Sequence, residues 1–248
     1  MMSSPLRFVI TFLAMFGLTV GSVAGQDKPK SKAKSDANLS KTTDDLKGLA
    51  LAMHNYHDTF NRFPAVGGDA GREKGRLSWR VYLLPYVEQE NLYRQFKMDE
   101  PWNSPHNKKL VSKMPEIYRP SNAKLASEGK TRIVVPVGAD TLFPADGRKM
   151  HLRSVTDGTS NTIMLLEADD EHAVVWTKPD DLEIDMKKPL EGLAIRPQGG
   201  FLAVVGDGSL RFIRKTAEPK TVAAMFTRAG SELAMLRPED LIELPRRQ

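Results

Sequence analysis

This chain contains no cysteine, so its five histidines and several groups of carboxylates are the residues best suited to metal binding and acid–base chemistry. The lack of thiols excludes disulfide frameworks, cysteine-ligated metal sites and thiol nucleophiles. His54 and His57 lie three residues apart, on neighbouring positions of one helix face, and with Asp58 or the distant His106 they could hold Zn²⁺. The alternative is that both imidazoles flank an apolar face and hydrogen-bond to loops. No His-Glu-x-x-His pattern supplies the base of a metalloprotease.

A second candidate metal site lies in the segment that begins at Asp157. Asp157, Thr159 and Asn161, with Ser160 between them, place several oxygens within five residues, which is a partial shell for Ca²⁺. The spacing is not that of an EF-hand. A glycine-containing Asx-turn explains the same residues without an ion, so we expect no cofactor, with Ca²⁺ or Zn²⁺ as the alternatives.

The tryptophans and the polar residues around one of them are candidates for ligand binding. Trp102 lies beside Asn103 and His106, a set that could stack on a sugar ring and hydrogen-bond to it. The prolines at 101 and 105 favour instead a rigid, capped loop with a buried ring. The ligand-binding hypothesis rests on Trp79, Trp102, Asn103, His106 and Trp176.

Catalysis has weaker support in the sequence. No Gly-x-Ser-x-Gly elbow is present, and no histidine has an obvious nucleophile and acid beside it. Asp169, Asp170 and Glu171 could supply the paired carboxylates of a glycosidase, but adjacent acids are typical of a solvated turn. We therefore expect a protein that is not an enzyme.

The beginning of the chain predicts export. A short apolar run after Arg7 and small residues up to Ala24 indicate a secretory signal over residues 1–24, with an uncleaved membrane anchor as the alternative. Residues 25–37 are rich in lysine and predict a flexible linker. The net charge of +5 is modest and the cations alternate with acids, so nucleic-acid binding is not expected.

The folded part begins with helices. Apolar residues recur every three or four positions over 43–60, which predicts an amphipathic first helix. Cap and proline positions predict two short helices within 78–96. Ser104 as a cap and Pro105 as first residue predict a third helix, and a last helix is expected over 218–235.

Short β-rich runs follow the helices. They predict strands at 131–137, 161–167, 173–177, 201–205 and 209–213. Gly206–Gly208 predicts a hairpin between the last two. Helices followed by antiparallel strands indicate an α+β domain over 38–235 and a loose tail over 236–248.

Six motifs occur in one order along the chain, and they are Leu46–Asp58 with Phe63 and Pro64, Ser78–Tyr86, Asp99–Asn107, Asp157–Ile163, Trp176–Leu182 and Asp207–Phe212. In these motifs the chain closely resembles the DUF1559 family of planctomycete bacteria, also labelled bacterial solute-binding family 10, over roughly residues 38–235. The matching residues are His54, Asn55, Tyr56, His57, Asp99, Pro101, Trp102, Pro105, His106, Asp157, Gly158, Ser160, Asn161, Asp207 and Gly208.

The resemblance implies a pseudopilin-like architecture, in which a helix packs on a small antiparallel sheet at the cell envelope. The chain departs from the family in two places. It lacks the prepilin-type start, and it has Pro197 ten residues before Asp207, where the family has a histidine. We therefore expect a soluble, extracytoplasmic protein rather than a filament subunit.

Three functions follow from these observations. The expected one is an exported, non-enzymatic structural or interaction protein of the cell envelope, whose partner is an envelope protein or a glycan. The alternatives are an extracytoplasmic solute- or glycan-binding module and a metal-dependent hydrolase. Contact with a membrane is expected only through an uncleaved signal, and the sequence indicates no oligomeric state.

Overall fold

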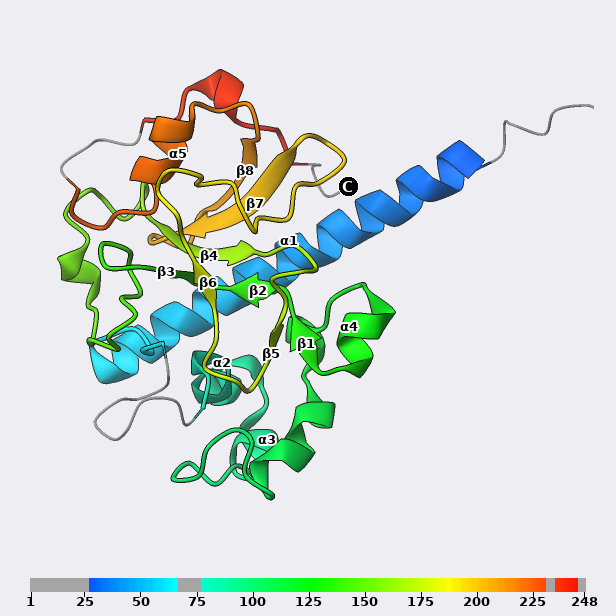
Figure 1. Cartoon of the computed structure of the whole chain (residues 1–248), viewed down its shortest axis with the longest axis vertical. Helices are drawn as coiled ribbons and strands as arrows, with labels where there is room; N and C mark the ends of the chain where they lie inside the picture. Colours follow the sequence, from blue (N-terminus) through cyan, green and yellow to red (C-terminus); the bar gives the residue numbers. More distant parts are fainter. Residues whose placement is uncertain (1–26, 67–76, 231–234, 245–248) are drawn as a thin grey trace, which may run out of the picture.

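A computed structural model describes residues 27–66, 77–230 and 235–244 of the chain. The predicted signal segment, residues 1–24, lies outside these ranges. Figure 1 shows one long helix, α1 (Asp27–Phe60), crossing the molecule, with a small sheet on one side of it and short helices on the other. No helix within the described ranges has both the length and the apolar character required to cross a bilayer.

Helix α1 is longer at its beginning than the sequence predicts. It starts at Asp27, so the expected flexible linker over 25–37 is wrong from Asp27 onward. Lysine and alanine are good helix formers, and extending a helix that already exists costs far less than nucleating one. The packed part supplies that nucleus, because its apolar side chains from Leu39 to Tyr56 are buried along one face.

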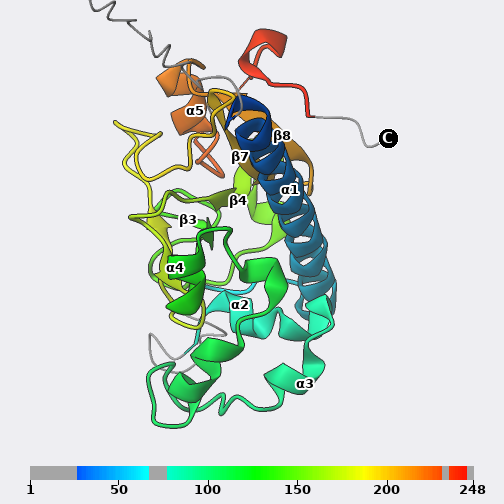
Figure 2. The same ribbon diagram turned by 90° about the vertical axis from the view of Figure 1, so that its right-hand side faces the viewer.

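The main sheet has four antiparallel strands in the order β2 (Ile133–Val134), β4 (Ile163–Glu167), β7 (Gly200–Val205) and β8 (Leu210–Arg214). In Figure 2 the sheet lies between α1 on one face and α5 (Pro219–Ala224) on the other. Side chains from both faces of β4 and β7 are therefore buried, which explains why these segments read as continuous apolar runs. The predicted hairpin at Gly206–Gly208 is confirmed.

Two further strand pairs are very short. β1 (Lys130–Thr131) pairs antiparallel with β5 (Val174–Val175), and β3 (Pro136–Val137) pairs parallel with β6 (Leu182–Glu183). The predicted strand over 131–137 is thus three short pieces, and β6 had no sequence prediction. The α+β class and the helix packed on an antiparallel sheet are confirmed; the pseudopilin likeness stays a prediction.

The short helices between α1 and β4 are α2 (Trp79–Tyr82), η1 (Leu84–Val87), α3 (Glu90–Tyr93), η2 (Asn107–Lys113), η3 (Glu116–Tyr118), α4 (Ala123–Ser127) and η4 (Leu152–Ser154). Residues 78–96 form three short helices rather than the two predicted, and α4 had no sequence prediction. Ser78 caps α2 by accepting from the Arg80 N–H at 3.2 Å. The Ser104 hydroxyl accepts from the Asn107 N–H at 3.0 Å, but the predicted helix start at Pro105 is two residues early, because η2 is a 3-10 helix that begins at Asn107 with His106 as its N-cap residue.

The C-terminal region differs from its prediction in two ways. The last long helix is only α5, since helix ends at Ala224 rather than at residue 235. The expected loose tail over 236–248 is ordered in its described part, where η5 (Pro238–Asp240) precedes a bridge from Leu241 to Ile213 of β8. The tail satisfies backbone groups that an edge strand would otherwise leave unpaired.

Candidate functional site

Trp79 and Trp176, two members of the predicted ligand-binding set, lie in the core. Neither has exposed surface. Trp176 stacks on Tyr118 with ring centroids 6.0 Å apart, and its indole N–H donates to the Val111 carbonyl at 2.8 Å. Because both rings are fully covered by protein, the structure corrects the expectation that they line a ligand pocket with Trp102.

The loop around Trp102 has the contacts of a capped loop. Trp102 is half-buried, whereas Asn103 and His106 are exposed. The His106 ring hydrogen-bonds to the Gln95 carbonyl at 2.8 Å. The fully buried Asn107 holds the loop, since its side chain bonds to three backbone carbonyls and one N–H. A sugar contact by Trp102, Asn103 and His106 stays a prediction.

The histidines proposed as zinc ligands serve different contacts. His57 Nε2 accepts from the Leu152 N–H at 3.2 Å, and burial lowers the pKa of this imidazole. His54 Nε2 is buried and has no hydrogen-bond partner, and His106 bonds to the separate loop described above. Among the described residues, no group of three His, Asp or Glu side chains is arranged to hold a metal ion.

The predicted calcium segment forms a tight turn. The Asp157 carboxylate accepts from the Gly230 N–H at 2.6 Å and from the Thr227 hydroxyl at 3.1 Å. The Asn161 amide donates back to the Asp157 carbonyl at 3.1 Å. The two bonds to the carboxylate come from residues about 70 positions later, so they connect the turn to the segment after α5. Calcium binding by Asp157, Thr159 and Asn161 stays a prediction.

Three family motifs that are distant in the sequence meet in one place. The Asp207 N–H donates to the Thr159 carbonyl at 3.0 Å, which joins the β7–β8 hairpin to the turn at 157–161. Gly208 has φ +85°, and a Cβ added there would lie 3.4 Å from His54 Nε2. The motif residues of α1 and of both turns therefore pack together at one end of the sheet.

A fully buried ion pair holds the segment that follows Trp176. Arg80 donates to the Asp181 carboxylate at 2.7 Å, and both side chains are 0% exposed. Asp181 also accepts from the Trp79 indole at 3.1 Å and from the Val135 N–H at 3.0 Å. Burial raises the pKa of Asp181, while the nearby Arg80 charge acts to lower it. The network fixes the chain at 180–183 against α2 and the sheet.

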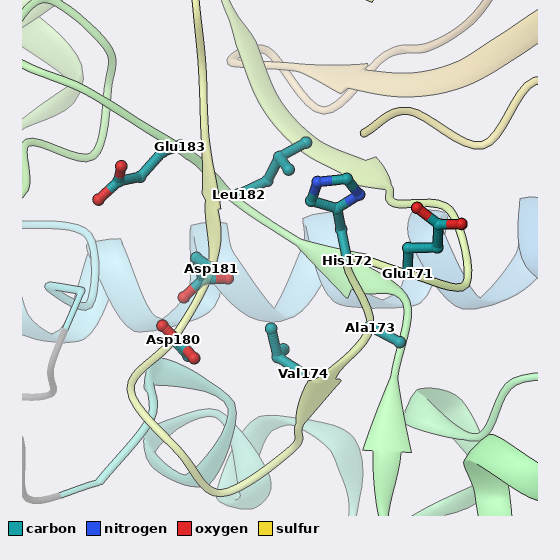
Figure 3. Close-up of a pocket in the computed structure, with 8 residues that line it drawn as sticks. All are labelled: Glu171, His172, Ala173, Val174, Asp180, Asp181, Leu182 and Glu183. Atoms are coloured by element: carbon teal, nitrogen blue, oxygen red, sulfur yellow. The ribbon is translucent and has the colours of Figure 1, made fainter. Parts of the chain in front are cut away.

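That segment forms one wall of an acidic pocket of about 410 Å³. Figure 3 shows the pocket between the segments 171–174 and 180–183, with carboxylates on both walls. Its lining residues are Glu171, His172, Ala173, Val174, Asp180, Asp181, Leu182 and Glu183. Asp180 is paired with Lys178 at 2.7 Å, and Asp181 with Arg80. The pocket can therefore attract cations mainly through Glu171 and Glu183.

His172 in this pocket forms a dyad with Asp169. Its Nδ1 lies 2.7 Å from Asp169 Oδ1, and this carboxylate also accepts from the backbone N–H groups of Glu171 and His172. Partial burial acts to raise the pKa of Asp169, but the hydrogen bonds from His172 outweigh it and hold that pKa below its usual value. The dyad leaves Nε2 for a general base, but the lining residues include no hydroxyl nucleophile.

A wider groove of about 560 Å³ lies beside α1. It is lined by Lys34, Ala37, Asn38, Lys41, Ser121, Asn122, Arg132 and Asp170. The four α1 residues have the spacing i, i+3, i+4, i+7, so they form one continuous helix face. An inner extension reaches Thr42, Asp45 and Glu167. Burial raises the pKa of Asp45, although Lys41 beside it acts to lower it.

Sequence reasoning missed both cavities. The acids at 169–171 were interpreted as a solvated turn, and Lys34 was placed in a flexible linker. The i, i+4, i+7 spacing of the polar residues Lys34, Asn38 and Lys41 was the available signal. It carried little weight alone, because the opposite wall comes from residues 121–122, 132 and 170.

A comparison with protein families gives one finding. A family model described as "Protein of unknown function (DUF1559)" matches residues 41–195, more than half of the chain. The matched range begins within α1 and ends before β7. No curated protein and no solved structure matches the chain.

Proposed function

We propose that this chain, which belongs to the DUF1559 family of unknown function, is an exported, non-enzymatic cell-envelope protein. It holds a folded body on a projecting helix and acts by binding other envelope components. The projecting part of α1, residues 27–33, which precede the groove beside α1, is the observation that carries this proposal. Figure 1 shows this part extending away from the sheet and from the short helices.

The projecting part makes few packing contacts with the body. Among the α1 side chains whose burial the structure describes, which begin at Lys32, the first buried apolar one is Leu39, and residues 32–34, 36 and 37 are exposed. At about 1.5 Å per residue, the seven residues 27–33 span about 10 Å. A charged helix of this length adds nothing to the core, so its cost in chain entropy must be offset by another role. Spacing the body from the surface to which the N-terminus leads is such a role.

Cell fractionation tests the export part of the proposal. Cells producing the full chain are separated into cytoplasm, envelope and medium, and compared with cells producing a chain that lacks residues 2–24. We expect the full chain in the envelope or the medium and the shortened chain in the cytoplasm. If the full chain stays in the cytoplasm, the proposal is wrong.

Assays of turnover test the non-enzymatic part. The Asp169–His172 dyad is the group best able to act as a base, so a hydrolysis screen of envelope glycans and esters is run on the full chain and on His172→Gln. We expect no turnover by either protein. Turnover that the substitution abolishes would replace this part of the proposal with an enzyme.

A second candidate function is the binding of an extracytoplasmic solute or glycan. The groove beside α1 favours it, since a volume of about 560 Å³ is within the ordinary range for small-molecule sites. A thermal-shift assay with the purified chain detects such binding, because a ligand at 100 times its Kd adds about 2.7 kcal/mol to the free energy of unfolding. A panel of solutes that gives no shift would count against this function.

A further inference from the structure

The groove beside α1 holds polar side chains that nothing in the described protein satisfies. The Lys34 ammonium, the Asn38 amide and the Ser121 hydroxyl all line it, and none has a hydrogen bond or ion pair with another described residue. Asn38 is half-buried. One cation, one amide and one hydroxyl that face a common space are the complement of a ligand with a carboxylate and several hydroxyl groups.

The floor of the groove contains a second, firmly held cation. Arg132 donates from Nε to the Ala168 carbonyl at 2.8 Å, and its Nη atoms lie 3.2 Å from Asp170 and 3.7 Å from Glu167. A guanidinium has five N–H groups, so these contacts leave at least two for a ligand. Its side chain is 18% exposed, which places the charge at a partly desolvated wall where it acts more strongly than in water.

The carboxylates near the groove are already paired. Asp170 accepts from the Asn122 amide at 2.8 Å as well as facing Arg132. Glu167 also receives Arg196, a buried cation that donates to the Thr42 hydroxyl at 2.7 Å. Since Arg132 is shared between Asp170 and Glu167, the ammonium of Lys34 gives the open part of the groove its net positive potential, and an anionic group is the favoured occupant.

We propose that the groove between α1 and residues 121–122 binds a carboxylate-bearing sugar. Lys34 and Arg132 hold the carboxylate, and Asn38 and Ser121 bond to ring hydroxyls. The proposal rests on the second candidate function and names its ligand class. It is independent of the acidic pocket, whose charge would repel the same ligand.

Calorimetric titration of the purified full chain tests the proposal. The probes are trigalacturonate, the neutral maltotriose, and sodium glutarate as a carboxylate without hydroxyls. Lys34→Glu reverses the sign of the charge at the groove, and Lys47→Glu makes the same change of charge at an exposed position of α1 outside the groove. Ser121→Ala removes only the hydroxyl. Both Lys34 and Ser121 are exposed, so these variants keep the fold.

We expect trigalacturonate to bind most tightly and to bind less well as the salt concentration rises. Lys34→Glu should raise the Kd for trigalacturonate at least tenfold, which corresponds to about 1.4 kcal/mol, and Lys47→Glu should change the Kd less than twofold.

Equal binding of maltotriose, or an unchanged Kd in Lys34→Glu, overturns the acidic-sugar proposal but leaves glycan binding in place. Tighter binding of glutarate than of trigalacturonate overturns the role of the hydroxyls. Absence of binding by all three probes overturns the proposal and removes the support for the second candidate function, while export is judged by fractionation alone.

Discussion

The buried pair of Arg80 and Asp181 gives the sharpest test of the packing described above. Replacing Asp181 with alanine removes the acceptor for the Arg80 guanidinium, the Trp79 indole and the Val135 N–H. Arg80 also donates to the Ile133 carbonyl, at 2.8 and 3.0 Å, and it is 0% exposed, so it cannot turn to solvent. Asp181→Ala therefore leaves an uncompensated charge in the core.

The magnitude follows from that burial. Breaking a buried pair by removing one partner costs about 3–5 kcal/mol. In a domain of this size each kcal/mol lowers the unfolding midpoint by about 2–4 °C, so Asp181→Ala should lower it by about 6–20 °C. Asp180→Ala is the matched control. Its carboxylate pairs with the exposed Lys178, and such surface pairs contribute about 0–1 kcal/mol.

Thermal unfolding followed by circular dichroism measures both variants, with the double variant Arg80→Met/Asp181→Leu as a third. Since the double variant removes both charges, it should be less destabilised than Asp181→Ala. If Asp181→Ala and Asp180→Ala lower the midpoint equally, the two carboxylates do not differ in burial and the reasoning is refuted.

Three further predictions concern the turn at Asp157, the close approach of β7 and β8 at Gly200, and His57. Asp157→Ala should lower the free energy of unfolding, measured in urea, by about 1–3 kcal/mol, because the Gly230 N–H loses its acceptor. Added Ca²⁺ should leave the urea midpoint of the unsubstituted chain unchanged. A higher midpoint with Ca²⁺ would restore the calcium hypothesis. Gly200→Ala should be strongly destabilising, since its Cβ would lie 2.4 Å from the Ile213 carbonyl oxygen, and a stability equal to wild type would contradict the close strand approach. The lowered pKa of His57 means that the unfolded chain binds its proton more readily, so stability is full above about pH 6.5 and falls as the pH drops below it. His57→Gln should flatten this fall in denaturation measured between pH 5 and 8, and an unchanged slope would assign it to other groups.

Local patterns predicted the parts of the fold that local forces decide. The apolar spacing from Leu46 to Tyr56 predicted the packed half of α1, although Phe60 at the end of the same pattern is exposed, and Gly206–Gly208 predicted the hairpin. The beginning of α1 was missed, because lysine-rich composition was weighed as disorder although Lys and Ala extend a helix that packing has already nucleated.

The sites depended on distant contacts. Asp180 and Asp181 are the same residue type side by side, yet only the carboxylate of Asp181 pairs with Arg80, about a hundred positions earlier. No periodicity separates two such acids. The groove likewise needs Lys34 and Arg132 to face each other, and that arrangement follows from the docking of α1, not from either local sequence.

The measurement that tests the central proposal most directly is labelling in intact cells. The chain has no cysteine, so Lys32→Cys places a single thiol on the projecting part of α1, where the side chain is exposed. A membrane-impermeant, photoactivatable maleimide is added to cells producing this variant, and a cytoplasmic protein with one exposed cysteine serves as control. The account predicts labelling of Lys32→Cys in intact cells and a discrete cross-linked product after illumination. Labelling that appears only after lysis, as in the control, would contradict it.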